Sequence, residues 1–492
     1  MKKIIILGGG AAGWLTALYC KKIYPNYEIK LIESKKIGIL GAGEGSTPHL
    51  VNFLKFININ ILDLVNKTKG TLKYGINFIN WNGDGNKYFH GFGSKNNFNN
   101  FNVKNIFNGE CYDKYLINCI SKNLNLDNYT YGGLLVDHKK NDPDNQDFSL
   151  HFDAHLIADY LKDVAIKRGV LHVVNELKEI KTDYDDNITS VVLNNDQEHI
   201  CDFIFDCSGF ARLIIGKHFK TKWIDYQKHL PMKKAVPFFL EQEKEIQPCT
   251  HAIAMKYGWI WKIPLQHRFG SGYIFDSDFI NEDEALSEAE EYLGQKLNSP
   301  KVIKFDAGRY ENVWVNNCMA VGLSSGFTEP LEATSLYLSV QQLHLFAHFK
   351  ESIFTSDKNI KDNFNKIIAN NNDEILNFLY LHYLSKRNDS EFWKNFRSNT
   401  VVPSSFKEYL HNIKSHNLFN LNFKTNKAYA GFETESYLVV AYGLGLLDSK
   451  KTTEIELLEP GVDEYKNFLD LSISNLESHS KFLQNINVPN NN

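Results

Sequence analysis

The sequence lacks several features that would narrow its class at once. Its seven cysteines stand at positions 20, 111, 119, 201, 207, 249 and 318, an odd number with no C-x-x-C pair. This spacing argues against a secreted disulfide framework and a zinc ribbon, so we expect a reduced, cytoplasmic protein without a metal site. The sequence also has no run of about 18 uninterrupted apolar residues, so no membrane-spanning helix is expected.

Excess positive charge is missing as well. Lys and Arg number 54 against 58 Asp and Glu, which gives a formal net charge of −4. Without a basic excess, neither nucleic acid nor an anionic membrane is an expected partner. The surplus is instead aromatic: Phe, Tyr and Trp make up 13% of the residues, a composition that suits large cores and flat aromatic ligands.

At 492 residues, the chain exceeds the size that a single core usually reaches, so more than one module is expected. No internal repeat and no Pro/Gly/Ser-rich linker divides it. The sequence leaves open whether the protein forms a homo-oligomer.

A β-α-β unit opens the chain. Residues 3–7 form an apolar run typical of a buried parallel strand, residues 11–23 have a helical pattern, and residues 27–33 alternate as a second strand. The segment between the first strand and the helix, Gly8-Gly9-Gly10-Ala11-Ala12-Gly13, matches G-x-G-x-x-G. Glu33 follows it by about 20 residues, which is the spacing of a dinucleotide site.

Each glycine of this motif has a physical role. Gly8 permits the tight turn, Gly10 lets the backbone approach a pyrophosphate, and Gly13 lets the helix pack on the strand. The N-terminus of the helix offers free N–H groups to the phosphates, and Glu33 can accept a hydrogen bond from a ribose hydroxyl. The alternative is a purely structural glycine-rich turn. The motif alone leaves FAD and NAD(P) open, although Glu33 would repel the extra phosphate of NADP.

Other segments complete the expected architecture. We expect strands at 71–81, 170–174, 202–206 and 257–275, a helix at 152–168, an irregular segment at about 82–108, a strand, turn and helix within 318–345, and mainly helices from about 345 onward. The strands ending in Cys207-Ser208-Gly209 and in Gly322-Leu323 resemble segments around FAD in flavin monooxygenase-like proteins, which favours FAD.

Because the nucleotide-binding segments are dispersed, we expect two interleaved modules in an α/β fold. A Rossmann-like FAD-binding module of the glutathione reductase and flavoprotein monooxygenase type would comprise residues 1–82, 145–215 and 300–345. A mixed sheet and helical substrate module would comprise residues 83–144, 216–299 and 346–492, its C-terminal part mostly helical.

Several motifs, in order along the chain, resemble those of the flavin-dependent tryptophan halogenases. They are the opening Gly8 to Trp14, the strap Gly43-Glu44-Gly45-Ser46-Thr47-Pro48, the signature Trp259-Ile260-Trp261-Lys262-Ile263-Pro264, the turn Gly326-Phe327-Thr328-Glu329-Pro330-Leu331-Glu332-Ala333-Thr334, and the C-terminal His382-Tyr383 and Asp389 to Trp393. Many flavoproteins share the opening motif, whereas W-x-W-x-I-P is much more selective.

The resemblance implies a chemistry. A separate flavin reductase would supply reduced FAD, which with O2 would oxidise a halide ion (chloride, bromide or iodide) to hypohalous acid. This acid would cross an internal passage to a lysine beside a small aromatic substrate and halogenate its ring. The expected cofactor contacts are Gly8, Gly10, Ala11, Ala12, Gly13, Glu33, Ser34, Gly43, Glu44, Ser46 and Leu323.

The same resemblance assigns the catalytic residues. Lys73 aligns with the lysine that holds or carries the electrophilic halogen, either as an ammonium bound to hypohalous acid or as a haloamine. Glu332 aligns with the active-site glutamate, which would orient the halogenating species or take the ring proton. Without the resemblance, Lys73 would be a solvated surface lysine and Glu332 a helix N-terminal acid.

Further residues are assigned in the same way. The backbone amides of Thr334 and Ser335 match the halide position, where tryptophan-specific members carry glycine in place of Ser335, so bromide or iodide use is open. Trp259 and Trp261 would share one face of a strand near the flavin and keep the organic substrate away from it, unless they are simply core residues. His90 and Phe92, in His90-Gly91-Phe92-Gly93, would line the aromatic substrate, with glycine in place of the family's proline.

The substrate itself stays open. The clamp that holds free tryptophan in the specific members has no residue-by-residue match in the region 428–446, so a simpler indole or another electron-rich aromatic is an equal candidate. Two other functions remain: an aromatic hydroxylase with the same opening fold, and a non-catalytic FAD-binding protein.

Overall fold

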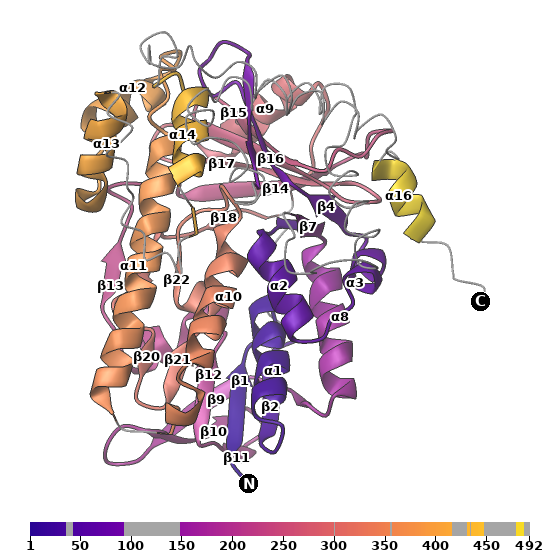
Figure 1. Ribbon diagram of the computed structural model, residues 1–492, viewed down its shortest axis with the longest axis vertical. Helices are drawn as coiled ribbons and strands as arrows, with labels where there is room; N and C mark the ends of the chain where they lie inside the picture. The colour runs from indigo at the N-terminus through magenta and orange to yellow at the C-terminus, as the bar shows by residue number, and fades with distance from the viewer. Residues whose placement is uncertain are drawn as a thin grey trace, which may run out of the picture.

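Two large sheets organise the protein, one at the bottom and one at the top of Figure 1. The computed structural model describes residues 1–35, 43–92, 148–299, 301–354, 357–415, 431–432, 434–446 and 479–486. The sheets, helices and side-chain contacts of the protein are described within these residues.

The lower sheet contains six strands in the order β20-β21-β12-β1-β2-β8. They are β1 (Lys3–Leu7), β2 (Glu28–Glu33), β8 (Leu171–Val174), β12 (Phe203–Asp206), β20 (Trp314–Val315) and β21 (Cys318–Ala320). All neighbours pair in parallel except β20 and β21. This is the expected Rossmann-like sheet, with β1 at its centre.

Both faces of this sheet are buried, which explains why its strands are apolar runs rather than alternating ones. Ile4 and Ile6 point to the side covered by α1 (Ala11–Ile23), α8 (Ala154–Lys167) and α10 (Thr334–Ala347). Ile5 and Leu7 point to the opposite side, which packs on a small sheet of β9 (Leu177–Thr182), β10 (Ile188–Leu193) and β11 (Glu198–Ile200).

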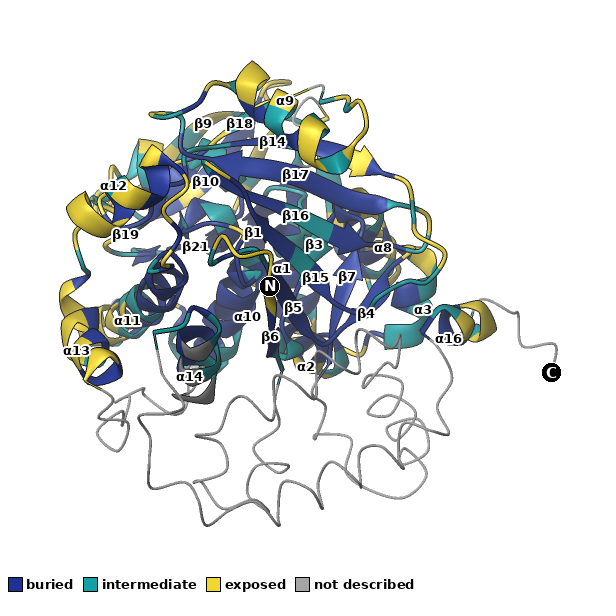
Figure 2. Cartoon of the chain, turned by 90° about the horizontal axis from the view of Figure 1, so that it is seen from above, coloured by how far each residue is buried: buried dark blue, intermediate teal, exposed yellow. Residues whose placement is uncertain are grey.

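The upper sheet has seven strands in the order β18-β14-β17-β16-β15-β5-β6, antiparallel except for the parallel pair of β15 and β5. They are β5 (Gly75–Ile79), β6 (Lys87–Gly91), β14 (Lys234–Leu240), β15 (Thr250–Ala254), β16 (Gly258–Pro264), β17 (Phe269–Phe275) and β18 (Ile303–Lys304). Figure 2 shows its strands buried among partly exposed helices.

Helices cover both faces of the upper sheet. The helix α9 (Glu282–Leu293) buries Ala285 and Ala289 against one face. Residues of α11 (Lys358–His382), α12 (Glu391–Asn399), α13 (Lys407–Lys414) and α14 (Thr434–Gly443) join the core on the other face. The long helix α11 runs beside both sheets in Figure 1 and so connects the two halves of the molecule.

Two more small sheets and three more α-helices belong to the described part of the fold. A three-stranded sheet joins β3 (Glu44–Gly45), β7 (Ser149–Phe152) and β4 (Thr71–Lys73), and another joins β13 (Trp223–Asp225), β19 (Gly308–Tyr310) and β22 (Gly326–Phe327). The remaining α-helices are α2 (Pro48–Phe56), α3 (Ile61–Lys67) and α16 (His479–Ile486). The first of these small sheets brings the Gly43–Pro48 strap next to Lys73.

Four expectations about secondary structure need correction. The strand expected at 257–275 is a hairpin of two antiparallel strands, β16 and β17. The strand expected at 71–81 is two strands, β4 and β5, which separate at Tyr74 and enter different sheets. The segment expected to be irregular contains β6, because Tyr88 and Phe89 pair with β5 after a turn in which Gly83 and Gly85 have positive φ; residues 93–108 lie outside the described residues. The helix expected from 152 begins at Ala154, since the Asp153 side chain caps it.

The C-terminal part is helical where it is described, as expected. None of the helices described is long and apolar enough to cross a membrane.

Candidate active site

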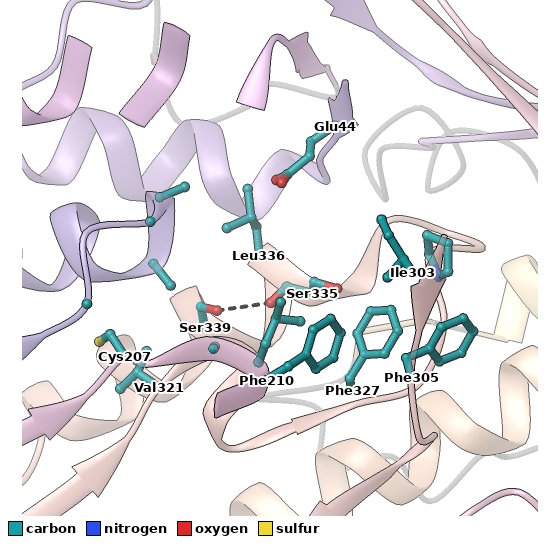
Figure 3. A pocket seen from close by; sticks show the side chains of 18 of the residues that line it. Glu44, Cys207, Phe210, Ile303, Phe305, Val321, Phe327, Ser335, Leu336 and Ser339 are labelled. Atoms are coloured by element: carbon teal, nitrogen blue, oxygen red, sulfur yellow. Dashed lines mark hydrogen bonds between the residues drawn. The ribbon is translucent and has the colours of Figure 1, made fainter. Parts of the chain in front are cut away.

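A cavity of about 600 Å³ extends from the glycine turn after β1 to Lys73 and Glu332. It lies between the two large sheets, since its walls include the ends of β1, β2 and β12 and the strand β16. Phe327, from the turn motif, forms part of its wall together with Phe210 and Phe305, which the sequence did not single out (Figure 3). The cavity therefore connects the dinucleotide motif with the predicted catalytic pair.

The glycine turn has the geometry that a dinucleotide requires. Gly8 has a φ of 122°, and a Cβ there would collide with the Cys207 carbonyl oxygen. A Cβ on Gly13 would collide with the Gly8 carbonyl oxygen, so helix α1 can approach the turn only with glycine there. A Cβ on Gly10 would meet nothing within 4 Å, which leaves its backbone open to the cavity. The residues present fit a bound FAD.

The end of β2 completes the nucleotide site. The Glu33 side chain lies against Gly9, where a Cβ would collide with its carboxylate, and it accepts a hydrogen bond from His172 Nε2 at 2.8 Å. Ser34 Oγ donates to Glu176 Oε1 at 2.8 Å. The four expected contacts Ala11, Ala12, Ser34 and Leu323 all line the cavity, together with Gly8, Gly10 and Glu33.

The strap runs along the cavity from β3. Gly43, Glu44 and Gly45 line it, and burial together with the charge of Asp153 raises the pKa of Glu44 to about 7. Two expected contacts, Gly13 and Ser46, do not line the cavity; Gly13 packs against Gly8 instead. The Ser46 hydroxyl lies 2.6 Å from Ser149 Oγ and donates to the Leu150 carbonyl at 2.9 Å, so its side chain ties the strap to β7 and is not part of the cavity wall.

Lys73 is fully buried at the end of β4. Its Nζ donates to the Ser46 carbonyl oxygen at 3.0 Å and lies 5.2 Å from the centre of the Phe92 ring. Burial lowers the pKa of Lys73 to about 8, against the opposing effect of the Glu332 and Cys249 charges. The lysine is therefore an ammonium group held at the cavity wall with few partners.

Glu332 lies in the turn before α10, and both it and Ala333 adopt the left-handed conformation, with φ of 64° and 56°. His90 Nδ1 lies 2.8 Å from Oε1 and 3.0 Å from Oε2, and His382 Nε2 lies 2.9 Å from Oε1. Burial alone would raise the pKa of Glu332, but the charges and hydrogen bonds of His90 and His382 lower it to about 2. Two imidazoles thus fix an ionised carboxylate in a strained turn.

The two residues expected to hold the halide lie at the N-terminus of α10. Thr334 and Ser335 are its first residues, and its N-cap, Ala333, makes no side-chain cap hydrogen bond. The first N–H groups of a helix have no acceptor within it, so they are available to an anion. Ser335 lines the cavity, and its carbonyl accepts a hydrogen bond from Ser339 Oγ (Figure 3).

The signature tryptophans lie on the same face of β16, as expected. Their rings are 6.3 Å apart, and both line the cavity together with Ile263, whereas Pro264 does not. Gly272 on β17 lies opposite Trp261, and a Cβ there would collide with the Trp261 ring. Trp259 is thus a buried core residue and Trp261 a partly buried one packed against the same core, and both form part of the cavity wall.

A buried chain of hydrogen bonds behind Trp259 was not anticipated from the sequence. Trp259 Nε1 donates to Tyr383 Oη at 3.1 Å, and Tyr383 donates to Glu329 Oε1 at 2.8 Å. Burial raises the pKa of Glu329 to about 8, against the effect of the Tyr383 hydrogen bond. Glu329 and Glu332, three residues apart, therefore differ in protonation at neutral pH.

The predicted substrate residues contact Glu332 and Lys73. His90 contacts Glu332 and lies 5.4 Å from Phe378, and Phe92 contacts Lys73. Neither lines the cavity described above. Gly93 and, within the region 428–446 compared with the tryptophan clamp, residues 428–430 and 433 lie outside the described residues.

A parallel sheet whose glycine turn opens into a cavity defines an α/β dinucleotide-binding enzyme. The sequence profile of the tryptophan halogenase family matches residues 3–458. The chain is 30% identical over 498 residues to tryptophan 6-halogenase SttH of Streptomyces toxytricini, covering 94% of this chain and 93% of that protein. It is 32% identical over 420 residues to tryptophan 7-halogenase RebH of Lentzea aerocolonigenes, covering 80% and 78%.

The structural comparison agrees. The solved structure of Tar14, a tryptophan C-6 flavin-dependent halogenase from taromycin biosynthesis, matches with a TM-score of 0.87 and 25% identity over 99% of this chain and 100% of that one. The chain therefore belongs to the tryptophan halogenase family and is a flavin-dependent halogenase. The family uses FAD, oxygen and a halide, with reduced flavin from a separate reductase.

Proposed function

We propose that this protein halogenates an electron-rich, indole-type aromatic through Lys73 and Glu332. The observation that carries the proposal is the cavity that links the dinucleotide turn to both side chains. A hydroxylase would have no use for a buried lysine and an ionised glutamate at the far end of such a passage. Family membership also argues against a non-catalytic FAD-binding protein.

The cofactor fits the nucleotide half of the cavity. Gly8, Gly10 and the N-terminus of α1 would hold the pyrophosphate of FAD, and Glu33 would receive a ribose hydroxyl. Bound reduced FAD would give two electrons to O2, which would take two more from a halide ion, so that one oxygen atom becomes hypohalous acid and the other becomes water. The amides of Thr334 and Ser335 would hold the halide at the cavity wall.

Lys73 would bind the oxidant. With a pKa of about 8, its Nζ is mostly protonated at neutral pH and can donate a hydrogen bond to the oxygen of hypohalous acid. This bond draws electrons from the halogen and makes it more electrophilic. When the aromatic ring attacks the halogen, the oxygen–halogen bond breaks and the oxygen leaves as water with a proton from Nζ.

Glu332 would complete the substitution by taking the proton from the ring carbon that now carries the halogen. A carboxylate whose pKa is about 2 is a weak base, but a halogenated arenium ion is a strong acid, so basicity is not limiting and position matters more. Glu332 gains the proton that Lys73 loses, and transfer between them restores both. The net change is a carbon–hydrogen bond and hypohalous acid converted to a carbon–halogen bond and water.

The substrate is proposed from the relatives and the aromatic surroundings. SttH and RebH are named for tryptophan, which makes tryptophan one candidate and simpler indoles another. His90 and Phe92, beside Glu332 and Lys73, would contact the flat ring. The division into an FAD-binding module and a substrate module at the boundaries expected from the sequence is part of the same proposal.

The test is a panel of tryptophan, other indoles and phenols, each incubated with the protein, FAD, a flavin reductase, NADH and oxygen. Product masses are compared with chloride, bromide, iodide and no halide. We expect a product heavier by one halogen in place of one hydrogen, formed only when halide is present. A halide-independent gain of one oxygen would show a hydroxylase instead.

A further inference from the structure

A threonine that the proposed mechanism does not use lies beside Lys73. Thr250, the first residue of β15, lines the same cavity and is buried. A Cβ added to Gly45 would lie 3.2 Å from Lys73 Nζ and 3.4 Å from Thr250 Oγ1. The missing side chain of Gly45 thus leaves a small space bordered by the ammonium group and the threonine hydroxyl.

The direction of the hydrogen bonds behind Thr250 follows from counting protons. Thr71 Oγ1 donates its only hydrogen to the Pro264 carbonyl oxygen at 2.7 Å. Thr71 Oγ1 also lies 2.9 Å from His151 Nδ1, so in that contact the imidazole must be the donor. This fixes the proton of His151 on Nδ1.

The second nitrogen of His151 then accepts. The ring is fully buried, and burial together with the charges of Lys73, His479 and His251 lowers its pKa well below the usual value, so it carries one proton. Its Nε2 lies 2.9 Å from Thr250 Oγ1. Thr250 must therefore donate its hydroxyl proton to His151, and only acceptor lone pairs of its oxygen are left for the cavity.

The space beside Gly45 is thus bordered by a donor and an acceptor. Lys73 Nζ uses one N–H on the Ser46 carbonyl and keeps others for a ligand, whereas Thr250 Oγ1 can only accept. A small molecule that both accepts and donates one hydrogen bond through a single oxygen fits this pair. Hypohalous acid, H–O–X, has this property, whereas a halide ion would be repelled by the lone pairs of Thr250.

We propose that Thr250 is a second binding residue for hypohalous acid, which accepts the O–H of the oxidant while Lys73 donates to the same oxygen. Thr71 and His151 are positioning residues, since they act by fixing the direction of the Thr250 hydroxyl. The inference rests on the proposed function, because it needs the oxidant to be formed. Its consequence is retention: an oxidant held at two points reaches the substrate before it diffuses away.

The test is run in bromide with the aromatic substrate and a soluble trap, monochlorodimedone, both present. It measures the amounts of brominated substrate and brominated trap that form for each reduced flavin oxidised. The variant Thr250→Val has nearly the same shape but no hydroxyl. We expect its brominated substrate to fall about tenfold, the loss typical of one hydrogen bond to a bound group, while trap bromination rises and flavin oxidation stays unchanged. Thr250→Ser keeps a hydroxyl acceptor and should give the wild-type ratio of brominated substrate to brominated trap.

Two further variants protect the test from a folding defect. Gly45→Ala removes no hydrogen-bonding group but fills the space beside Lys73, so it should shift oxidant to the trap as Thr250→Val does. Ser271→Ala removes another buried hydroxyl from the same sheet, outside the cavity. It should leave the ratio of brominated substrate to brominated trap unchanged.

The outcomes are distinguishable. The role of Thr250 is overturned if Thr250→Val or Gly45→Ala has the wild-type ratio of brominated substrate to brominated trap, or if Thr250→Ser does not restore that ratio. These results leave the halogenase proposal standing. A wild-type protein that brominates neither the substrate nor the trap overturns both.

Discussion

Lys73 is a cationic side chain held in a fully buried position, and this has a cost that can be measured. Its pKa falls from 10.5 to about 8 in the folded protein. Between about pH 8 and pH 10.5, the unfolded chain binds more protons at Lys73 than the folded one. The free energy of unfolding that Lys73 contributes therefore rises with pH over this range. At pH 7 the cost is about 3 kcal/mol, since one pKa unit corresponds to about 1.4 kcal/mol.

Replacing Lys73 by methionine should therefore stabilise the protein while abolishing halogenation. We expect the free energy of unfolding at pH 7 to rise by roughly 1–3 kcal/mol, and the gain to shrink toward pH 10. Urea denaturation at both pH values measures it. Lys256→Met, at an exposed position, serves as the control, and its free energy of unfolding should change by no more than about 0.5 kcal/mol. A Lys73→Met variant less stable than wild type at pH 7 would contradict the assignment.

Glu332 and Glu329 offer a matched pair of carboxyl groups. Glu332 is ionised at neutral pH and Glu329, with a pKa of about 8, is mostly neutral. Glu332→Gln removes a charge and should slow halogenation by about 10²- to 10⁴-fold, the usual range for a positioned base. Glu329→Gln replaces one neutral group by another and should retain activity within about threefold. Turnover with a common substrate measures both, and equal losses would argue against a specific role for Glu332.

At the scale of elements, the β1–turn–α1 unit was the part most open to sequence reasoning. Its strand, its helix and the close approach of Gly13 to Gly8 depend on contacts between residues close along the chain, so spacing alone predicts them, whereas the contact of Gly8 with Cys207 comes from the sheet. The β4–β5 segment shows the limit. Its apolar pattern is continuous, but Tyr74 separates two strands that enter different sheets, and only tertiary pairing decides that.

The same unit makes a prediction about the cofactor. Gly8 has a φ of 122° and no room for a Cβ beside the Cys207 carbonyl, so Gly8→Ala should displace the turn and weaken FAD binding at least about tenfold. Gly85 also has a positive φ, but a Cβ there would meet nothing within 4 Å, so Gly85→Ala controls for backbone strain alone. Quenching of flavin fluorescence on titration gives both affinities; unchanged binding in Gly8→Ala would place FAD elsewhere.

At the scale of the whole molecule, the site is assembled from distant segments. The sequence motifs named Lys73, Glu332 and His90 separately, and the structure brings them together around one end of the cavity. His382 belongs to a recognised motif, but its contact with Glu332 has no local signal because it depends on how α11 packs. The Thr71–His151–Thr250 chain joins three strands and was equally invisible in the sequence. The module boundaries stay a prediction.

The central claim is that oxidant made at the flavin end of the cavity is delivered to Lys73 at the other end. Lys73→Ala tests it most directly, with brominated aromatic product and brominated monochlorodimedone measured per reduced flavin oxidised. The account predicts that this variant still consumes flavin and bromide and still brominates the trap, but loses at least about 99% of the aromatic product, a barrier increase of about 2.7 kcal/mol. Aromatic bromination at the wild-type rate in Lys73→Ala would contradict it.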